Sequence, residues 1–197
     1  MPDIRADGLA FQYPDQPPLF EDLTFRIGHG TTALTGPSGS GKSTLLGILA
    51  GWLRPSHGDV SNLPSRTQWV LQSPIGSPRR SALSHVELPL LAAGALLQDA
   101  SAEAYDILAR VGLDAVAERP LRHLSGGEAQ RLMLARAMAA KPELMLVDEP
   151  TASLDATSAA TVIEVIHALA DTGMPIVIAT HDLHLADACR SRIEVRR

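Results

Sequence analysis

The chain has 197 residues, of which 45% are hydrophobic and 20% are charged. That length suits one ordinary globular domain, and the composition excludes a disordered chain, a collagen-like fibre and a disulfide scaffold. The single cysteine, Cys189, excludes an intrachain disulfide and a thiolate metal cluster. The net charge of −5 argues against broad binding to the phosphate backbone of nucleic acids, so we expect no nucleic-acid partner.

Membrane-spanning and secretory segments are not expected in this sequence. The first residues, MPDIRADG, lack the basic and then apolar leader of a secreted protein. The longest nearly uncharged apolar run, Leu88–Gln98, is far shorter than the roughly 20 residues that span a bilayer. If the protein works at a membrane, we therefore expect another chain to supply the spanning helices.

The first part of the chain predicts strands followed by a helix. Residues 4–27 hold two strand-like runs separated by prolines, which indicates an antiparallel hairpin. The β-branched run Thr31–Thr35 leads into a glycine-rich segment, and apolar residues follow with helical spacing from Lys42. Another short strand is predicted to end near Trp69–Leu71.

A helical insertion is predicted in the middle of the chain. The segment Ser73–Ser81 is rich in Pro, Ser and Gly and is interpreted as a loop. Ser101 has the character of an N-cap, and the helix that it would begin is expected to end at Gly112. This helical segment interrupts the strands on either side.

The C-terminal third returns to alternating strands and helices. Leu144–Val147 and Ile176–Ala179 are continuous apolar runs, as expected for parallel strands buried on both faces. An apolar stripe with helical spacing lies between them, and Ile193–Val195 predicts a last short strand. The alternation predicts an α/β fold with a mostly parallel sheet.

The glycine-rich segment has the pattern of a phosphate-binding loop, G-x-x-x-x-G-K-[ST], between a strand and a helix. Its glycines permit backbone angles that aim N–H groups at an anion, and the following helix adds its positive end. Lys42 would bring a full charge to the terminal phosphates, and the Ser43 hydroxyl suits Mg²⁺. The residues predicted to hold the nucleotide are Gly36, Pro37, Ser38, Gly39, Ser40, Gly41, Lys42, Ser43 and Thr44.

Polar residues follow two of the predicted buried strands. Asp148 and Glu149 come directly after one strand, and His181 comes after the next. Parallel sheets bind ligands at the carboxyl ends of their strands. Asp148 is therefore a candidate Mg²⁺ ligand, Glu149 a candidate base for the attacking water, and His181 a candidate contact for the γ-phosphate or that water. An acidic pair after a strand is more often only the start of a helix, but the phosphate loop favours the catalytic interpretation.

The segment 124–131, LSGGEAQR, predicts a second helix N-terminus suited to an anion. It closely resembles the LSGGQ signature of ATP-binding cassette (ABC) proteins, with Glu128 where Gln is common. The resemblance covers nearly the whole chain, with the motifs in the family's order. It implies a P-loop NTPase core, an antiparallel β subdomain at about 1–30 and 58–71, and a helical subdomain at about 73–140, all within one ABC ATPase domain.

The resemblance also implies roles for residues that carry little signal by themselves. Tyr13 matches the aromatic residue that stacks on adenine, with Phe11 as the alternative. Gln72 matches the glutamine that approaches Mg²⁺, and Asp155 lies in the loop that passes across a dimer interface. In the family, each ATP lies between one subunit's phosphate loop and the other's signature, so the signature residues would act in trans. These residues are Ser125, Gly126, Gly127 and Glu128.

The function implied by the resemblance is an ATPase subunit that powers a membrane transporter, using ATP and Mg²⁺. Its expected partners are a second cassette, identical or not, and integral membrane subunits, which would place it in the cytoplasm on the inner face of the cell membrane. Ser81–Gly94 is similar to the matching part of macrolide and lipoprotein exporter cassettes. The alternative is a soluble ABC ATPase acting on nucleic acid or ribosomes, which usually carries a long coiled-coil insertion or two cassettes.

Overall fold

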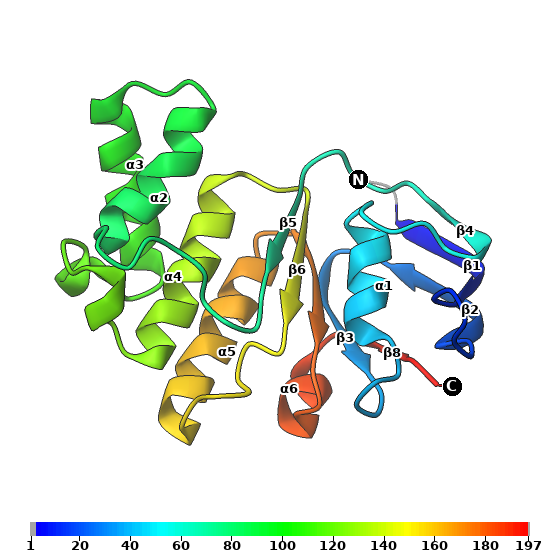
Figure 1. Ribbon diagram of the computed structural model, residues 1–197. Helices are drawn as coiled ribbons and strands as arrows, with labels where there is room; N and C mark the ends of the chain where they lie inside the picture. Colours follow the sequence, from blue (N-terminus) through cyan, green and yellow to red (C-terminus); the bar gives the residue numbers. More distant parts are fainter. Residues whose placement is uncertain (1–2, 197) are drawn as a thin grey trace. The chain divides into compact units, whose positions relative to one another are not determined.

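The computed structural model describes residues 3–196, which form two compact units (Figure 1). The first unit comprises the described residues up to Trp69, the segment Glu143–Glu149 and the described residues from Leu169 onward. The second comprises Val70–Pro142 and Pro150–Ala168. None of the described helices has the length and apolar character needed to cross a membrane.

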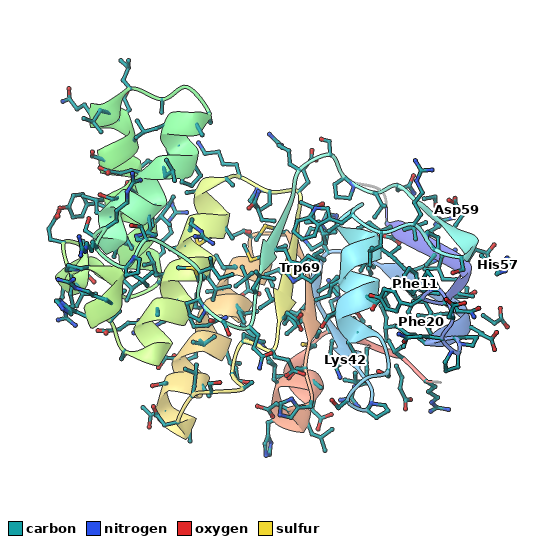
Figure 2. All side chains as sticks on the ribbon, viewed as in Figure 1. Phe11, Phe20, Lys42, His57, Asp59 and Trp69 are labelled. Atoms are coloured by element: carbon teal, nitrogen blue, oxygen red, sulfur yellow. The ribbon has the colours of Figure 1, made fainter. Side chains whose placement is uncertain are left out.

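A three-stranded antiparallel sheet begins the first unit, in the order β2-β1-β4. Its strands are β1 (Ile4–Phe11), β2 (Phe20–Ile27) and β4 (His57–Ser61). Phe11 and Phe20 are paired across β1 and β2, with ring centroids 6.4 Å apart (Figure 2). Both rings are buried in the core of this unit. Aromatic packing thus joins the two strands of the hairpin that the sequence predicts.

The five-stranded sheet has the order β5-β6-β7-β3-β8. Its pairings of β3 with β7 and β8, and of β6 with β7, are parallel, which confirms the predicted fold class. The strands β6 and β7 are almost wholly buried, and the short helix α1 packs against both. The element bounds are β3 (Gly30–Thr35), α1 (Lys42–Leu49), β5 (Thr67–Val70), β6 (Leu144–Asp148), β7 (Pro175–Ala179), α6 (Leu183–Ala188) and β8 (Ser191–Glu194).

The segment 58–71, which the family resemblance assigns to the antiparallel part, contributes to two sheets. Its first strand, β4, pairs with β1, whereas β5 is the neighbour of β6 in the five-stranded sheet. The backbone N–H of Glu143 donates to the carbonyl of Arg66 at 2.7 Å, and the Glu143 carboxylate accepts from the Arg66 N–H. These bonds connect the start of β5 to the start of β6.

The second unit is helical. It contains α2 (Ala82–Ala92), α3 (Leu97–Arg110), α4 (Gly126–Ala139) and most of α5 (Ala156–Ala170), with short 3₁₀ helices at Asp114–Val116 and Leu121–His123. The expectation that Ser101 caps a helix was wrong, because α3 already begins at Leu97. The Ser101 hydroxyl instead donates to Glu87 Oε1 on α2 at 2.6 Å. The Ser101 side chain, which the local sequence pattern assigned to a helix cap, therefore forms a contact between α3 and α2.

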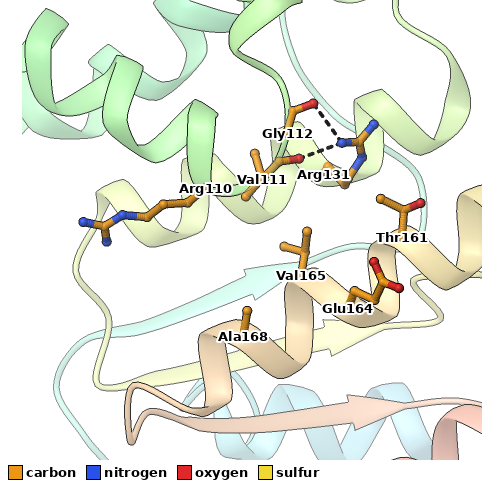
Figure 3. A pocket seen from close by; sticks show the side chains of 8 residues that line it. All are labelled: Arg110, Val111, Gly112, Arg131, Thr161, Glu164, Val165 and Ala168. Carbon is orange, nitrogen blue, oxygen red and sulfur yellow. Dashed lines mark hydrogen bonds between the residues drawn. The ribbon is translucent and has the colours of Figure 1, made fainter.

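Helix α4 is fastened to the end of α3 by one arginine. Arg131 Nη1 donates to the carbonyl oxygens of Val111 and Gly112, at 2.7 and 3.0 Å (Figure 3). These carbonyls follow the last residue of α3, where helical partners are lacking. A cavity of about 240 Å³ lies beside this contact, lined by Glu164 and Val165 of α5 among others.

Candidate active site

The phosphate loop lies between the end of β3 and the start of α1. Gly36, Gly39 and Gly41 have φ values of 148°, 75° and 98°, which favour glycine. A Cβ on Gly36 would also lie 2.4 Å from the carbonyl oxygen of Val195 and 2.8 Å from Ser40 Oγ. The glycine spacing in the sequence thus corresponds to backbone angles and space that other residues would not accept here.

Lys42 is the first residue of α1 and reaches back over the loop. Its Nζ donates to the carbonyl oxygens of Gly36 at 2.9 Å and Pro37 at 3.3 Å. The ammonium group therefore lies next to the loop whose N–H groups, together with the N-terminus of α1, favour an anion. This is the charge distribution needed for polyphosphate binding.

Asp148 is the last residue of β6 and is close to the start of α1. Burial raises its pKa, while a hydrogen bond from the Ser43 hydroxyl and the charge of Lys42 act in the opposite direction. The nearby carboxylate of Glu149 adds to the rise. The sheet therefore brings together a carboxylate, a hydroxyl and a lysine from two segments about a hundred residues apart.

Glu149 and His181 are in direct contact, although they follow different strands. Glu149 Oε2 lies 2.8 Å from His181 Nδ1 and accepts from the backbone N–H of His181 at 3.3 Å. With its proton on Nδ1, the His181 ring can donate to this carboxylate. The Glu149 N–H donates to the Ala179 carbonyl at 2.8 Å, and its φ of 45° lies in the left-handed region. That conformation costs about 1 kcal/mol or more, as is found at functional sites.

A cavity of about 350 Å³ joins His181 to the phosphate loop. Its walls come from the carboxyl ends of β3 and β7 and from β8. His181, Gly36 and Pro37 all line it. The histidine is largely exposed, whereas the Glu149 side chain has only 14% of its surface exposed. His181 and the first residues of the phosphate loop thus line one cavity at the carboxyl end of the parallel sheet.

The two candidate adenine-stacking residues differ in exposure. Phe11 is buried in the core, whereas Tyr13 is 39% exposed and packs edge-on against Phe11 with centroids 4.9 Å apart. The Tyr13 hydroxyl is 3.3 Å from the Thr44 hydroxyl, in the first turn of α1. Of the two rings, only that of Tyr13 has a large surface free for a ligand.

The signature segment begins α4 in the second unit. Ser125 is its N-cap: the Ser125 hydroxyl accepts from the Glu128 N–H at 3.2 Å, and Glu128 Oε2 accepts from the Ser125 N–H at 2.7 Å. This capping box lowers the pKa of Glu128, mainly through the Ser125 N–H. The box leaves the N–H groups of Gly126 and Gly127 without helical partners, as an anion-binding helix start requires.

Gln72 and Asp155 also belong to the second unit. Gln72 is exposed just after β5. Asp155 immediately precedes α5, and its Oδ1 accepts from the Ser158 N–H at 3.0 Å. Sequence reasoning missed Ser158, although an Asp just before an apolar helix is an N-cap signal, and its carboxylate is expected to accept from the N–H two or three residues on.

Several known proteins are similar to this chain in sequence or in structure. The model of the family described as ABC transporter matches residues 20–152. The lipoprotein-releasing system ATP-binding protein LolD of Chromohalobacter salexigens is 36% identical over 93% of this chain and 86% of its own. The cobalt import ATP-binding protein CbiO of Rhodobacter capsulatus is 32% identical over 100% of this chain and 76% of its own.

A solved structure of the ATP-binding cassette MJ0796 has the same fold. It is a dimeric post-hydrolysis state bound to ADP and Pi, with a TM-score of 0.81 and 27% identity. The match covers 98% of this chain and 97% of that one.

Proposed function

The chain belongs to the ABC transporter family, as an ATP-binding and ATP-hydrolysing subunit that powers a membrane transporter, and from this premise we propose which residues carry each step. The observation that carries the proposal is the contact of Glu149 with His181 in a unit that also holds the phosphate loop. Lys42 and the loop N–H groups bind the phosphates of ATP.

Hydrolysis begins when a water oxygen attacks the γ-phosphorus. The new oxygen–phosphorus bond forms as the bond to the bridging oxygen of ADP breaks, and ADP leaves with that electron pair. Glu149 accepts the proton of the attacking water. His181 donates from Nδ1 to the same carboxylate and so holds it in one orientation. Phosphate and the proton are then released, and the site returns to its starting state.

The residues around Asp148 also fit a magnesium ion. Mg²⁺ takes oxygen ligands, and the Ser43 hydroxyl lies in hydrogen-bond contact with the Asp148 carboxylate. We infer that Ser43 and Asp148 hold Mg²⁺. The bound ion would neutralise charge on the β- and γ-phosphates.

Tyr13 is the better supported adenine contact. Its exposed ring and its hydroxyl contact with Thr44 put it beside the start of α1, whereas Phe11 is committed to the core. We infer that Tyr13 stacks on the base while the loop holds the phosphates.

Two copies of the cassette would complete each ATP site. The signature of one subunit, with the free N–H groups of Gly126 and Gly127, faces the phosphates bound by the other subunit's loop. The dimeric MJ0796 cassette with ADP and Pi supports this arrangement. The second copy is either identical or a sister cassette.

Mixed dimers provide a test of shared sites. Ser125→Arg and Lys42→Ala subunits are each expected to be inactive alone, because every site then contains a defect. Equal mixing should restore up to about a quarter of wild-type ATPase activity, since about half of the dimers are mixed and each holds one intact site. As a control, Lys42→Ala is mixed with a subunit carrying both changes, which leaves no intact site. A mixture as inactive as this control would contradict sharing.

The membrane partner is inferred from the relatives. The relative named for lipoprotein release and the relative named for cobalt import have similar sequence identity to this chain, 36% and 32%. We therefore infer that the membrane subunits determine the cargo and the direction of transport. We propose that the protein is cytoplasmic and peripheral on the inner face of the cell membrane. A net charge of −5 disfavours the alternative partner, nucleic acid.

The partner can be captured with the dimer held closed. Tagged Glu149→Gln protein, incubated with ATP and detergent-solubilised membranes of its source cell, is expected to co-purify with a polytopic membrane protein. The same pull-down with Lys42→Ala, which binds ATP poorly, is the control. Recovery of ribosomes or DNA-repair factors in place of a membrane protein would favour the soluble alternative.

A further inference from the structure

The signature turn packs directly against the loop that precedes α5 and against the first turn of that helix. A Cβ built on Gly126 would lie 3.2 Å from Leu154 Cδ2, and one built on Gly127 would lie 2.9 Å from Ser158 Cβ and 3.1 Å from its hydroxyl. Both glycines of the signature therefore touch the segment 154–158, with no room for a side chain at Gly127. Two functional segments, about thirty residues apart in the sequence, form one packed surface in the second unit.

Ser158 is the residue that joins them. Its hydroxyl donates to Asp155 Oδ2 at 2.7 Å, and its backbone N–H donates to Asp155 Oδ1 at 3.0 Å. Both oxygens of the Asp155 carboxylate are thus engaged by one half-buried residue. The two bonds, the backbone one first, hold the pKa of Asp155 below its usual range. The Cβ and the hydroxyl oxygen of Ser158 are also the atoms nearest to a Cβ built on Gly127.

We propose that Ser158 is a positioning residue for ATP hydrolysis, which holds Asp155 with its hydroxyl and supports the signature turn through Gly127. This inference rests on the proposed function, in which the signature faces the second subunit, and on the family resemblance, which assigns the Asp155 loop to the same dimer interface. Two hydrogen bonds already fix the orientation of the Asp155 carboxylate in the single subunit. Dimer closure therefore loses little further conformational entropy at this side chain. The hydroxyl therefore acts on dimer closure and not on the initial binding of ATP.

Ser158→Ala isolates the hydroxyl. In a Glu149→Gln background, the protein concentration needed for ATP-driven dimerisation should rise about tenfold, the loss expected for one hydrogen bond to a charged group. In the otherwise unchanged protein, kcat should fall by a similar factor. The affinity of the monomer for ATP should not change, because the phosphate loop and Lys42 lie outside the changed contact. Equilibrium sedimentation and nucleotide titration separate these quantities.

Thr161→Val is the matched control. Thr161 lies one turn further along α5, and its hydroxyl donates to the Thr157 carbonyl within the helix. Removing that hydroxyl should leave dimerisation unchanged. Equal dimerisation of Ser158→Ala and Thr161→Val would overturn the inference. A wild-type chain that neither dimerises with ATP nor hydrolyses it would overturn the proposed function instead.

A double-mutant cycle separates positioning from general destabilisation. Asp155→Ala should impair dimerisation, and adding Ser158→Ala should then cost little more, because the hydroxyl has lost the group through which it acts. If Ser158→Ala weakened dimerisation by the same factor with and without Asp155→Ala, the inference would be overturned. This holds even if urea unfolding shows that Ser158→Ala lowers the stability of the fold.

Discussion

Glu149→Gln is expected to bind ATP with unchanged affinity while its ATP turnover falls by about a hundredfold or more, the share carried by a general base. The amide keeps the size of the side chain, and its oxygen can still accept from His181. It cannot take the proton of the attacking water. ATP should therefore remain bound, and a stable ATP-dependent dimer should accumulate, as measured by size-exclusion chromatography.

Glu21→Gln supplies the control, because it makes the same chemical change at an exposed position on β2. That variant should turn over ATP at the wild-type rate and form no long-lived dimer. If Glu149→Gln also hydrolysed ATP at the wild-type rate, Glu149 would not be the general base. Another group would then have to accept the proton of the attacking water.

Lys42→Ala is expected to weaken ATP binding by about ten- to a hundredfold, the loss of charge-assisted hydrogen bonds to phosphate. The Lys42 ammonium group donates to the loop carbonyls of Gly36 and Pro37. From this position it can donate to the terminal phosphates of bound ATP. AMP lacks those phosphates, so its affinity should change much less. Titration calorimetry with ATP and AMP measures both.

Lys141, the other lysine of the chain, is the matched control. It pairs with Glu103 at 2.8 Å on the surface of the second unit. Lys141→Ala should bind ATP as tightly as the wild type. An unchanged ATP affinity in Lys42→Ala would count against the phosphate-loop assignment.

Features that depend on neighbouring residues were predictable from the sequence. The phosphate loop follows from glycine spacing, because its φ values are local backbone requirements. The inner strands β6 and β7 follow from their unbroken apolar runs. The start of α4 at Gly126 follows from Ser125 and Glu128, which satisfy each other's N–H groups three residues apart. In each case the interacting atoms belong to one short segment.

Only the tertiary structure decided contacts between distant segments. It joined Glu149 to His181, chose Tyr13 over Phe11 as the exposed ring, and gave Ser101 a partner on another helix. It also put Ser158 against Gly127, a contact that neither residue indicates alone. The sequence by itself determined the family, the phosphate loop and the starts of α1 and α4, since these depend on backbone angles and local hydrogen bonds. Which side chains meet depends on strand order and helix packing, which local patterns do not specify.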